Sequence, residues 1–317
     1  MASSRNINRA DDASLHGSPD YHIPVLLHEA VDALNIQSDG VYVDCTFGGG
    51  GHSKAILKHL GTKGKLIAFD QDPDAGKQLP ADERLIFVPH NFRHLSRFLR
   101  LHGVAQIDGL LADLGVSSHQ FDEGTRGFST RFEGPLDMRM SPTQSRTAAT
   151  ILQTYTREQL HKLFEQYGEV TNAKTLAATI VTARKTNAFE TIADLKHAIG
   201  SIVKGNPHKY YAQVFQALRI EVNEELVVLE EMLAQLPALL RKGARVAIIS
   251  FHSLEDRMVK NFFRKGSFEP EDSNPFATGK PTSPFLIVTK KPVTAGAEEL
   301  KKNPRSRSAK LRVAEKI

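Results

Sequence analysis

Four successive glycines at positions 48–51, followed by His52, are well suited to holding a nucleotide-like ligand. Glycine has no Cβ, so the backbone can approach a ligand closely, and the N-terminus of a following helix offers free N–H donors. An apolar run at 41–44 precedes the glycines, and a helix is expected over about residues 53–60. This arrangement predicts a cofactor site, although NAD and FAD enzymes share it and a plain tight turn is the alternative.

Acidic residues end three apolar runs that we expect to be parallel strands. Asp44 precedes the glycines, Asp70 ends the run at 65–70, and Asp113 ends the run at 109–113. Ligands bind at the carboxyl ends of such strands, so all three carboxylates should face one crevice, where Asp70 can accept the ribose hydroxyls of an adenosine. Three acids together are costly unless they bind hydroxyls, amines or a sulfonium. S-adenosylmethionine supplies all of these, whereas Asp113 would repel the phosphates of a dinucleotide, and this favours a methyltransferase.

Alternating strand and helix patterns predict an α/β, doubly wound sheet that positions these residues. Near-continuous apolar runs, typical of strands buried on both faces, occur at 41–44, 65–70, 85–88, 109–113 and 245–250, and two further strands are expected at 286–289 and 310–314. Between about 145 and 240 the pattern is helical, with helices expected at 147–152, 157–167, 172–185, 191–204 and 211–239.

The simplest account of this order is one sheet domain interrupted by a helical insertion. We expect a methyltransferase domain at 21–130 and 220–317, with an inserted all-helical substrate-recognition domain at 131–219. Residues 1–20 are polar and are expected to form a disordered tail rather than a signal peptide. The stretch 266–284 is rich in proline, glycine and serine and is expected to be a mobile loop.

The composition is that of an ordinary globular chain with a mildly basic surface. Its 317 residues include 41 Lys and Arg against 36 Asp and Glu, a net charge of +5, which suits a polyanionic partner without requiring one. The stretch 301–307 is dense in cations. Cys45 is the only cysteine, which excludes an internal disulfide and fits a reducing cytoplasm. No run reaches the roughly 18 apolar residues of a membrane span, and no histidine spacing indicates a metal.

Six blocks of the sequence together resemble one protein family. They are, in chain order, His22-Ile23-Pro24-Val25-Leu26-Leu27, Asp44-Cys45-Thr46-Phe47-Gly48-Gly49-Gly50-Gly51-His52-Ser53, Asp113-Leu114-Gly115-Val116-Ser117-Ser118, Gly134-Pro135-Leu136-Asp137-Met138-Arg139-Met140, Phe215-Gln216-Ala217-Leu218-Arg219-Ile220 and Ser250-Phe251-His252-Ser253-Leu254-Glu255-Asp256-Arg257. Across about residues 21–317 the chain resembles the RsmH (MraW) family. The resemblance implies a Rossmann-like class I fold and methyl transfer from S-adenosylmethionine to the exocyclic N4 of one cytidine in 16S ribosomal RNA, at the decoding centre, as naked RNA or within the small ribosomal subunit.

The resemblance also implies which residues hold S-adenosylmethionine. They are the residues that match Gly50, Gly51, His52, Asp70, Phe92, Asp113 and Gln120, and each is present. Cys45 stands where glycine or alanine also occurs in relatives, a departure just before the glycines that leaves the cofactor loop intact.

The residues themselves favour nitrogen or oxygen as the methyl acceptor. Methylation of a pyrimidine at carbon 5 generally needs a cysteine nucleophile, and Cys45 is badly placed to attack a base. Asp113 is the best candidate to accept a hydrogen bond from the amine and draw its nitrogen toward a tetrahedral geometry. No aromatic residue follows Asp113 in the run Asp113-Leu114-Gly115-Val116, so the residue that stacks on the base must come from elsewhere.

Ser250 and His252 end the fifth predicted strand and should therefore reach the same crevice. We expect them to contact the target base or its ribose, and the alternative for this segment is structural, with Ser253 capping a helix that begins at Leu254.

The helical insertion is expected to recognise RNA. Its cations are Lys174, Arg184, Lys185, Lys204, Lys209 and Arg219, although any one of them could simply face solvent. A small-molecule methyltransferase of the same fold would need neither the insertion nor the basic stretch. A non-catalytic RNA-binding factor would not need the intact glycines and acids.

Overall fold

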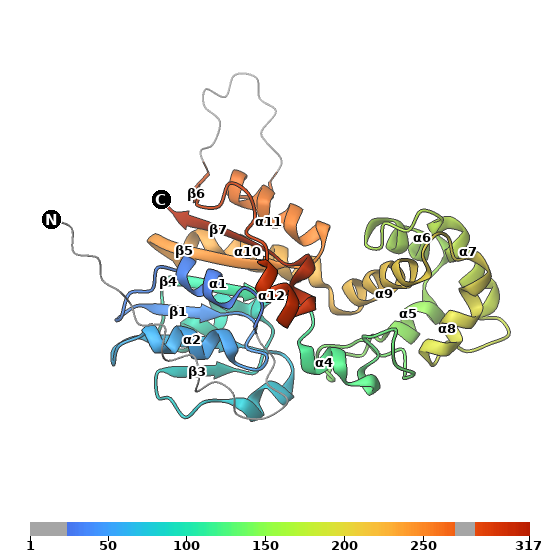
Figure 1. Cartoon of the computed structure of the whole chain (residues 1–317), viewed down its shortest axis with the longest axis horizontal. Helices are drawn as coiled ribbons and strands as arrows, with labels where there is room; N and C mark the ends of the chain where they lie inside the picture. Colours follow the sequence, from blue (N-terminus) through green and yellow to red (C-terminus); the bar gives the residue numbers. More distant parts are fainter. Residues whose placement is uncertain (1–23, 270–282) are drawn as a thin grey trace, which may run out of the picture.

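The computed structural model describes residues 24–269 and 283–317, and a mixed seven-stranded sheet forms its centre (Figure 1). The strand order is β3-β2-β1-β4-β5-β7-β6, with β1 to β5 parallel and the last two strands antiparallel to their neighbours. The strands are β1 (Val41–Asp44), β2 (Lys65–Phe69), β3 (Leu85–Val88), β4 (Ile107–Asp113), β5 (Leu240–Ser250), β6 (Phe285–Ile287) and β7 (Lys310–Lys316). The predicted α/β sheet of seven strands is thus confirmed. The predicted tail at 1–20 and most of the predicted loop at 266–284 lie outside the described residues.

Helices cover both faces of this sheet. Val43 lies in a core with α3, α10 and α11, whereas its neighbour Tyr42 lies in a second core with α1 and α2. These helices are α1 (Leu27–Ala33), α2 (Gly51–His59), α3 (Leu95–Leu101), α10 (Glu225–Leu239) and α11 (Ser253–Lys265). Successive strand residues point to opposite faces, so a strand covered on both faces must be apolar throughout. This is why these strands were recognisable as continuous hydrophobic runs.

The register of the parallel strands decides how far each strand-end acid projects. Asp44 pairs with Ala68 of β2 and with Leu111 of β4. Asp70 and Asp113 each come two residues after those partners, so they lie one pleat period closer to the rim than Asp44. Asp70 and Asp113 therefore lie at the carboxyl edge of the sheet, whereas Asp44 lies one pleat period inside that edge.

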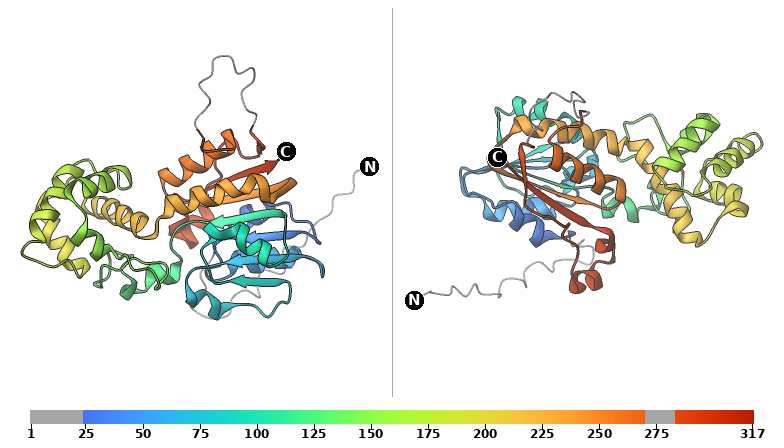
Figure 2. Two further views of the ribbon diagram at one scale, coloured as in Figure 1. Left: turned by 180° about the vertical axis from the view of Figure 1, so that it is seen from behind. Right: turned by 90° about the horizontal axis from the view of Figure 1, so that it is seen from above.

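A separate hydrophobic cluster holds the helical part of the chain together, beside the sheet (Figure 2). It runs from Phe128 to Val222, just outside the limits of the predicted insertion, and shares no residue with the two cores of the sheet. Its helices are α5 (Ala148–Thr154), α6 (Arg157–Gln166), α7 (Ala173–Ala183), α8 (Ile192–Ile199) and α9 (Pro207–Asn223). The short α4 (Ser118–Asp122) leads toward this cluster and α12 (Ala297–Lys302) precedes β7. Of the helices in the described ranges, none combines the length and apolar character needed to cross a membrane.

The single helix predicted at 211–239 is wrong, because the segment forms two helices. Between α9 and α10, Glu224 has a φ of 52°, in the left-handed region that non-glycine residues rarely adopt. Arg93 holds the Glu224 carboxylate through a 2.8 Å bond from Nη1. The break redirects the chain, so that Glu225 enters the wall of the pocket described below.

Candidate active site

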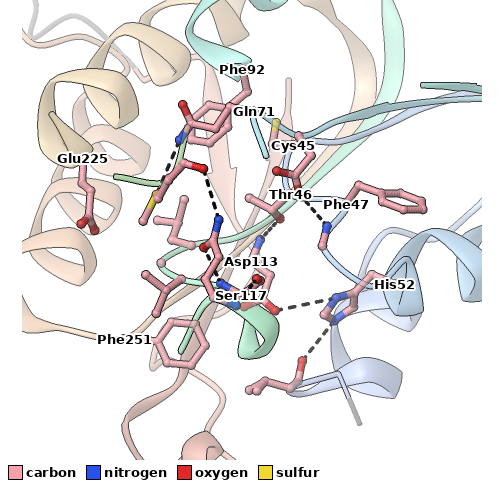
Figure 3. A pocket seen from close by; sticks show the side chains of 18 of the residues that line it. Cys45, Thr46, Phe47, His52, Gln71, Phe92, Asp113, Ser117, Glu225 and Phe251 are labelled. Atoms are coloured by element: carbon pink, nitrogen blue, oxygen red, sulfur yellow. Dashed lines mark hydrogen bonds and ion pairs between the residues drawn. The ribbon is translucent and has the colours of Figure 1, made fainter. Parts of the chain in front are cut away.

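A pocket lies where the parallel strands β1, β2 and β4 end (Figure 3). The glycine loop forms one side of it, and the start of α10 together with the turn between β5 and α11 forms another. The predicted cofactor residues that line the pocket are Gly51, His52, Asp70, Phe92, Asp113 and Gln120. Gly50 is not among the residues that line it. Tertiary structure thus brings together residues that span about seventy positions of the sequence.

Gly50 and Gly51 have different structural reasons to be glycine. Gly50 caps α2 with a φ of 75°, and a Cβ there would lie 2.7 Å from the ring of Phe47. Gly51 begins α2, and a Cβ there would lie 2.1 Å from Cγ of Pro24. The absence of these carbons lets the helix N-terminus and the segment at Pro24 pack closely along the pocket wall.

Asp70 ties the glycine loop to the end of β2. Its Oδ2 accepts from the backbone N–H of Gly48 at 2.8 Å, and its Oδ1 accepts from that of Asp72 at 2.9 Å. Burial raises the pKa of Asp70 to about 6, against the opposing effect of these two donors. Asp72 caps the following 3-10 helix, η2 (Pro73–Gln78). The remaining lone pairs of Asp70 are therefore available to a ligand in the pocket.

Asp113 faces His52 across the pocket edge (Figure 3). Nε2 of His52 lies 3.1 Å from the carbonyl oxygen of Val25, which can only accept, so this nitrogen carries the proton. Burial lowers the pKa of His52, and the unprotonated Nδ1 of the neutral ring lies 3.9 Å from Oδ2 of Asp113. Burial, followed by the charge of Asp44, raises the pKa of Asp113 well above its usual value. Oδ1 of Asp113 is buried with no hydrogen-bond partner in the described part of the chain, while the side chain as a whole is 23% exposed, so the carboxyl group keeps acceptor capacity that a ligand in the pocket can use.

Asp44 does not line the pocket, which corrects the expectation of three acids in one crevice. Its side chain is fully buried, with Oδ2 accepting from the Ser53 hydroxyl at 2.7 Å and Oδ1 from the Thr46 N–H at 3.0 Å. The strand register accounts for this, because Asp44 lies one pleat period below the rim. Asp44 anchors the glycine loop to α2.

Gln120 lines the pocket while its side chain is held by its neighbours. Its Oε1 accepts from the N–H of Ser117, and the Ser117 hydroxyl accepts in return from the N–H of Gln120, a capping box at the start of α4. The amide nitrogen of Gln120 donates to Asp72 at 2.6 Å. Gln120 therefore gives the pocket wall a fixed shape and links it to the segment after β2.

Ser250 and His252 do not line the pocket. The Ser250 hydroxyl is buried and donates to the carbonyl oxygen of Lys310 in β7 at 3.4 Å. His252 caps α11, with Nδ1 accepting from the N–H of Glu255 at 3.4 Å. The cap is thus one residue earlier than the Ser253 considered from sequence, and the Ser250 hydroxyl and Nδ1 of His252 are both engaged within the fold.

The residue between them, Phe251, does line the pocket, and sequence reasoning missed it. Figure 3 shows Phe251 and Glu225 on the side of the pocket opposite His52. A Cβ at Gly115 would lie 3.7 Å from the Phe251 ring, so this ring flanks the segment that follows Asp113. Its position immediately after a strand that ends at the crevice was the available signal.

Two further missed residues, Glu225 and Glu255, belong to a buried charged network beside Phe251. Glu255 Oε2 accepts from the N–H of Phe251 at 2.9 Å, and side-chain atoms of Glu225, His252 and Glu255 lie within 4.8 Å of one another. Arg219 donates to both oxygens of Glu225, at 2.7 and 2.9 Å. Burial would raise the pKa of Glu255, but the hydrogen bond with His252 and the charge of Arg219 hold it below its usual value. Through Glu255, the network holds the backbone N–H of Phe251 in place.

Two of the cations expected to face RNA are held inside the fold. Arg219 is paired with Glu225, and Nη1 of Arg184 donates to the carbonyl oxygens of Leu152 and Tyr155. The remaining four, Lys174, Lys185, Lys204 and Lys209, are exposed.

Cys45 lines the pocket, but its thiol is expected to be unreactive. The thiol is buried, and this burial, with a smaller effect of the adjacent Asp44 charge, raises its pKa well above the usual value. A thiol that stays protonated is a poor nucleophile, which agrees with an acceptor other than a ring carbon.

Comparison with known proteins gives the same family as the sequence blocks. A model described as the MraW methylase family matches residues 20–317. The protein named Ribosomal RNA small subunit methyltransferase H of Parabacteroides distasonis is 52% identical over 94% of this chain and 98% of its own length. The protein of the same name from Azobacteroides pseudotrichonymphae is 54% identical over 94% of this chain and 98% of its own. Because the family model and both relatives match over nearly the whole length, this chain belongs to the MraW methylase family.

Proposed function

We propose that this chain transfers a methyl group from S-adenosylmethionine to the exocyclic N4 of a cytidine in 16S ribosomal RNA. Membership in the MraW methylase family and the name shared by the relatives support a methyltransferase that acts on small-subunit ribosomal RNA. The structural observation that carries the proposal is Asp113, a half-buried carboxyl group with one unpartnered oxygen, beside the glycine loop and at the carboxyl end of β4.

The residues of the pocket fit S-adenosylmethionine. Asp70 retains acceptor capacity for the ribose hydroxyls, and Phe92 offers an apolar surface for the adenine. Gly51 lets the start of α2 pack directly against Pro24 in the pocket wall, and the carboxylate of Asp113 is favourable to the cationic end of the cofactor. When bound, S-adenosylmethionine supplies an electrophilic methyl group on a sulfonium.

Asp113 is the proposed proton acceptor. The lone pair of an exocyclic amine is delocalised into the base, and a hydrogen bond from N4–H to a carboxylate draws the nitrogen toward a tetrahedral geometry. Asp113 would take up the proton that N4 loses when it accepts the methyl group from the sulfonium. The neutral Nδ1 of His52, 3.9 Å from Oδ2, supports the protonated carboxyl group that results.

Phe251 is the proposed aromatic partner of the target base. The segment after Asp113 contains no aromatic residue, and Phe251 lies beside it at Gly115. Ring stacking of this kind is sequence-tolerant and replaces the stacking that a flipped-out base loses. We assign Glu255 and His252 a positioning role, since they hold the turn that carries Phe251.

We assign recognition of the RNA to the helical part at 131–219, which carries four exposed lysines. The remaining sequence, 21–130 and 220–317, would form the catalytic domain. A ribosomal RNA substrate also supports a cytoplasmic location and the small ribosomal subunit as partner.

Cofactor binding should weaken as the pH falls through about 6, the pKa of Asp70. Below this pH the carboxyl group is protonated and offers a weaker acceptor to the ribose hydroxyls. Binding at about pH 5.5 should therefore release a proton, which titration calorimetry in two buffers of different ionisation enthalpy measures. Asp70→Asn should bind weakly with no such dependence. An affinity that stays constant between about pH 5 and pH 7 would contradict the assignment.

The proposed function is tested by methyl transfer from labelled S-adenosylmethionine to small ribosomal subunits from cells that lack this protein. We expect one labelled nucleotide, identified as N4-methylcytidine by mass spectrometry. Subunits from wild-type cells, already methylated, are the control and should accept no label. Label on carbon 5, on a ribose, or on a small molecule alone would refute the proposal.

A further inference from the structure

Two arginines from distant parts of the chain converge on one phenylalanine ring. The guanidinium carbon of Arg305 lies 5.0 Å from the centroid of Phe121, and that of Arg131 lies 5.4 Å from it. Arg131 also lies 5.9 Å from the centroid of Phe132. Phe121 is in α4, Arg131 and Phe132 follow it in the loop, and Arg305 is in the 3-10 helix η6 (Pro304–Ser308). We call Phe121, Arg131, Phe132 and Arg305 the rim cluster.

The rim cluster adjoins the active-site pocket. Arg305 lines the pocket, and so does Gln120, the residue before Phe121. Figure 1 shows the C-terminal segment that contains α12 near α4, although the two segments are far apart in the sequence. An ion pair between Arg305 and Asp122 joins the two segments directly.

The rim cluster is accessible to solvent and carries positive charge. The side chain of Arg131 is 64% exposed and that of Phe132 is also exposed. Asp122 is the acid paired with both arginines, and its distance to Arg131 is 3.9 Å. Exposed pairs of this kind contribute little to stability. Asp122 thus orders the guanidinium groups over Phe121 while most of their N–H donors stay free.

We propose that the rim cluster is a stacking subsite for the unpaired nucleotide next to the target cytidine, an inference that rests on the proposed function. A cytidine that enters the pocket must leave its stack, so its neighbour loses a stacking partner as well. Guanidinium planes and aromatic rings are the groups on which proteins stack unpaired bases. Arg131 and Phe132 supply that surface, and Arg305, between the subsite and the pocket, binds the phosphate that joins the two nucleotides.

The cationic stretch 301–307 then has a defined place in substrate binding. Lys301, Lys302 and Arg307 are exposed on α12 and η6, the segment that carries Arg305. They extend the positive surface outward from the rim cluster. RNA would therefore be held on both sides of the pocket, by this stretch and by the helical part of the chain.

The experiment measures binding of the full chain to small ribosomal subunits that lack the modification, together with the affinity for S-adenosylmethionine. Arg131→Ala and Arg305→Ala should each raise the dissociation constant for subunits about tenfold, and Arg131→Ala, at a residue that does not line the pocket, should leave cofactor affinity within about twofold of wild type. Arg305→Ala should also lower the slope of log affinity against log salt by about one. Arg97→Ala is the matched control, because Arg97 lies 5.9 Å from the Phe98 ring on α3, which contributes no residue to the pocket.

Arginine-to-lysine variants separate stacking from simple charge. Lysine keeps the charge but has no planar guanidinium, so Arg131→Lys should show most of the loss seen with alanine. Full rescue by lysine, or alanine variants that bind subunits as tightly as Arg97→Ala, would overturn the stacking subsite. Failure of the wild-type chain to form N4-methylcytidine would instead refute the proposed function, and the binding series still decides whether the rim cluster contacts RNA.

Discussion

Replacing Asp113 with asparagine should lower kcat for methyl transfer by about 10²–10⁴-fold, the contribution typical of a positioned general base. Asparagine keeps the size of the side chain but cannot take up the amine proton. In the wild type, kcat should fall as the pH drops below the pKa of Asp113 in the complex, because a protonated carboxyl group cannot accept. Asp113→Asn should lack this acidic limb, and pH profiles of kcat under saturating cofactor measure the difference.

Asp108→Asn is the matched control for this variant. Asp108 lies on the same strand, away from the pocket, and binds Arg241 at 2.7 Å and the N–H of Val41 at 2.7 Å. It should leave kcat unchanged. A kcat for Asp113→Asn within about threefold of that control would remove Asp113 from the role of proton acceptor.

A stability measurement distinguishes the loss of a catalytic group from damage to the fold. Burial raises the pKa of Asp113 above its unfolded value, so its contribution to stability is present at low pH and is lost as the pH rises through the folded pKa. Asparagine carries no charge to bury. The free energy of unfolding of Asp113→Asn should therefore exceed that of the wild type at about pH 7 but not at about pH 4, as measured by urea denaturation.

Gly51→Ala should have the second largest effect, lowering methyl transfer about 100-fold. The new Cβ would lie 2.1 Å from Cγ of Pro24, so either Pro24 or the start of α2 must move. Both belong to the pocket wall, and a displacement of about 1 Å at such a site is enough for a loss of this size. Overpacking should also lower the free energy of unfolding by about 1–3 kcal/mol.

Gly49→Ala is the control for this steric argument. A Cβ at Gly49 would meet only Oε1 of Gln78, at 3.5 Å, which is an ordinary contact. Gly49→Ala should keep the free energy of unfolding close to that of the wild type. If thermal unfolding gives the same value for both variants, close packing at Pro24 is not what Gly51 provides.

The strands and the glycine loop could be predicted from sequence because local patterns determine them. A strand covered on both faces must be apolar at every position, and the run that contains Tyr42 and Val43 meets this condition. A chain reversal that allows no Cβ requires glycine, as at Gly50. The break at Glu224 could not be predicted, since the sequence around it has no glycine or proline and both helices are apolar on their buried side.

The sequence by itself determined that acids end the strands, that glycines follow β1 and that the family blocks occur in order. Tertiary structure decided which of these acids can act. Asp44 and Asp113 are each the last residue of a strand. Strand pairing sets Asp44 beside Leu111, however, so Asp44 lies two residues farther from the carboxyl edge of the sheet than Asp113. Packing also decided that Phe251, rather than its neighbours Ser250 and His252, enters the pocket. Local patterns fix where a strand ends, but the direction and depth of a side chain depend on register and on distant segments, which one stretch of sequence does not contain.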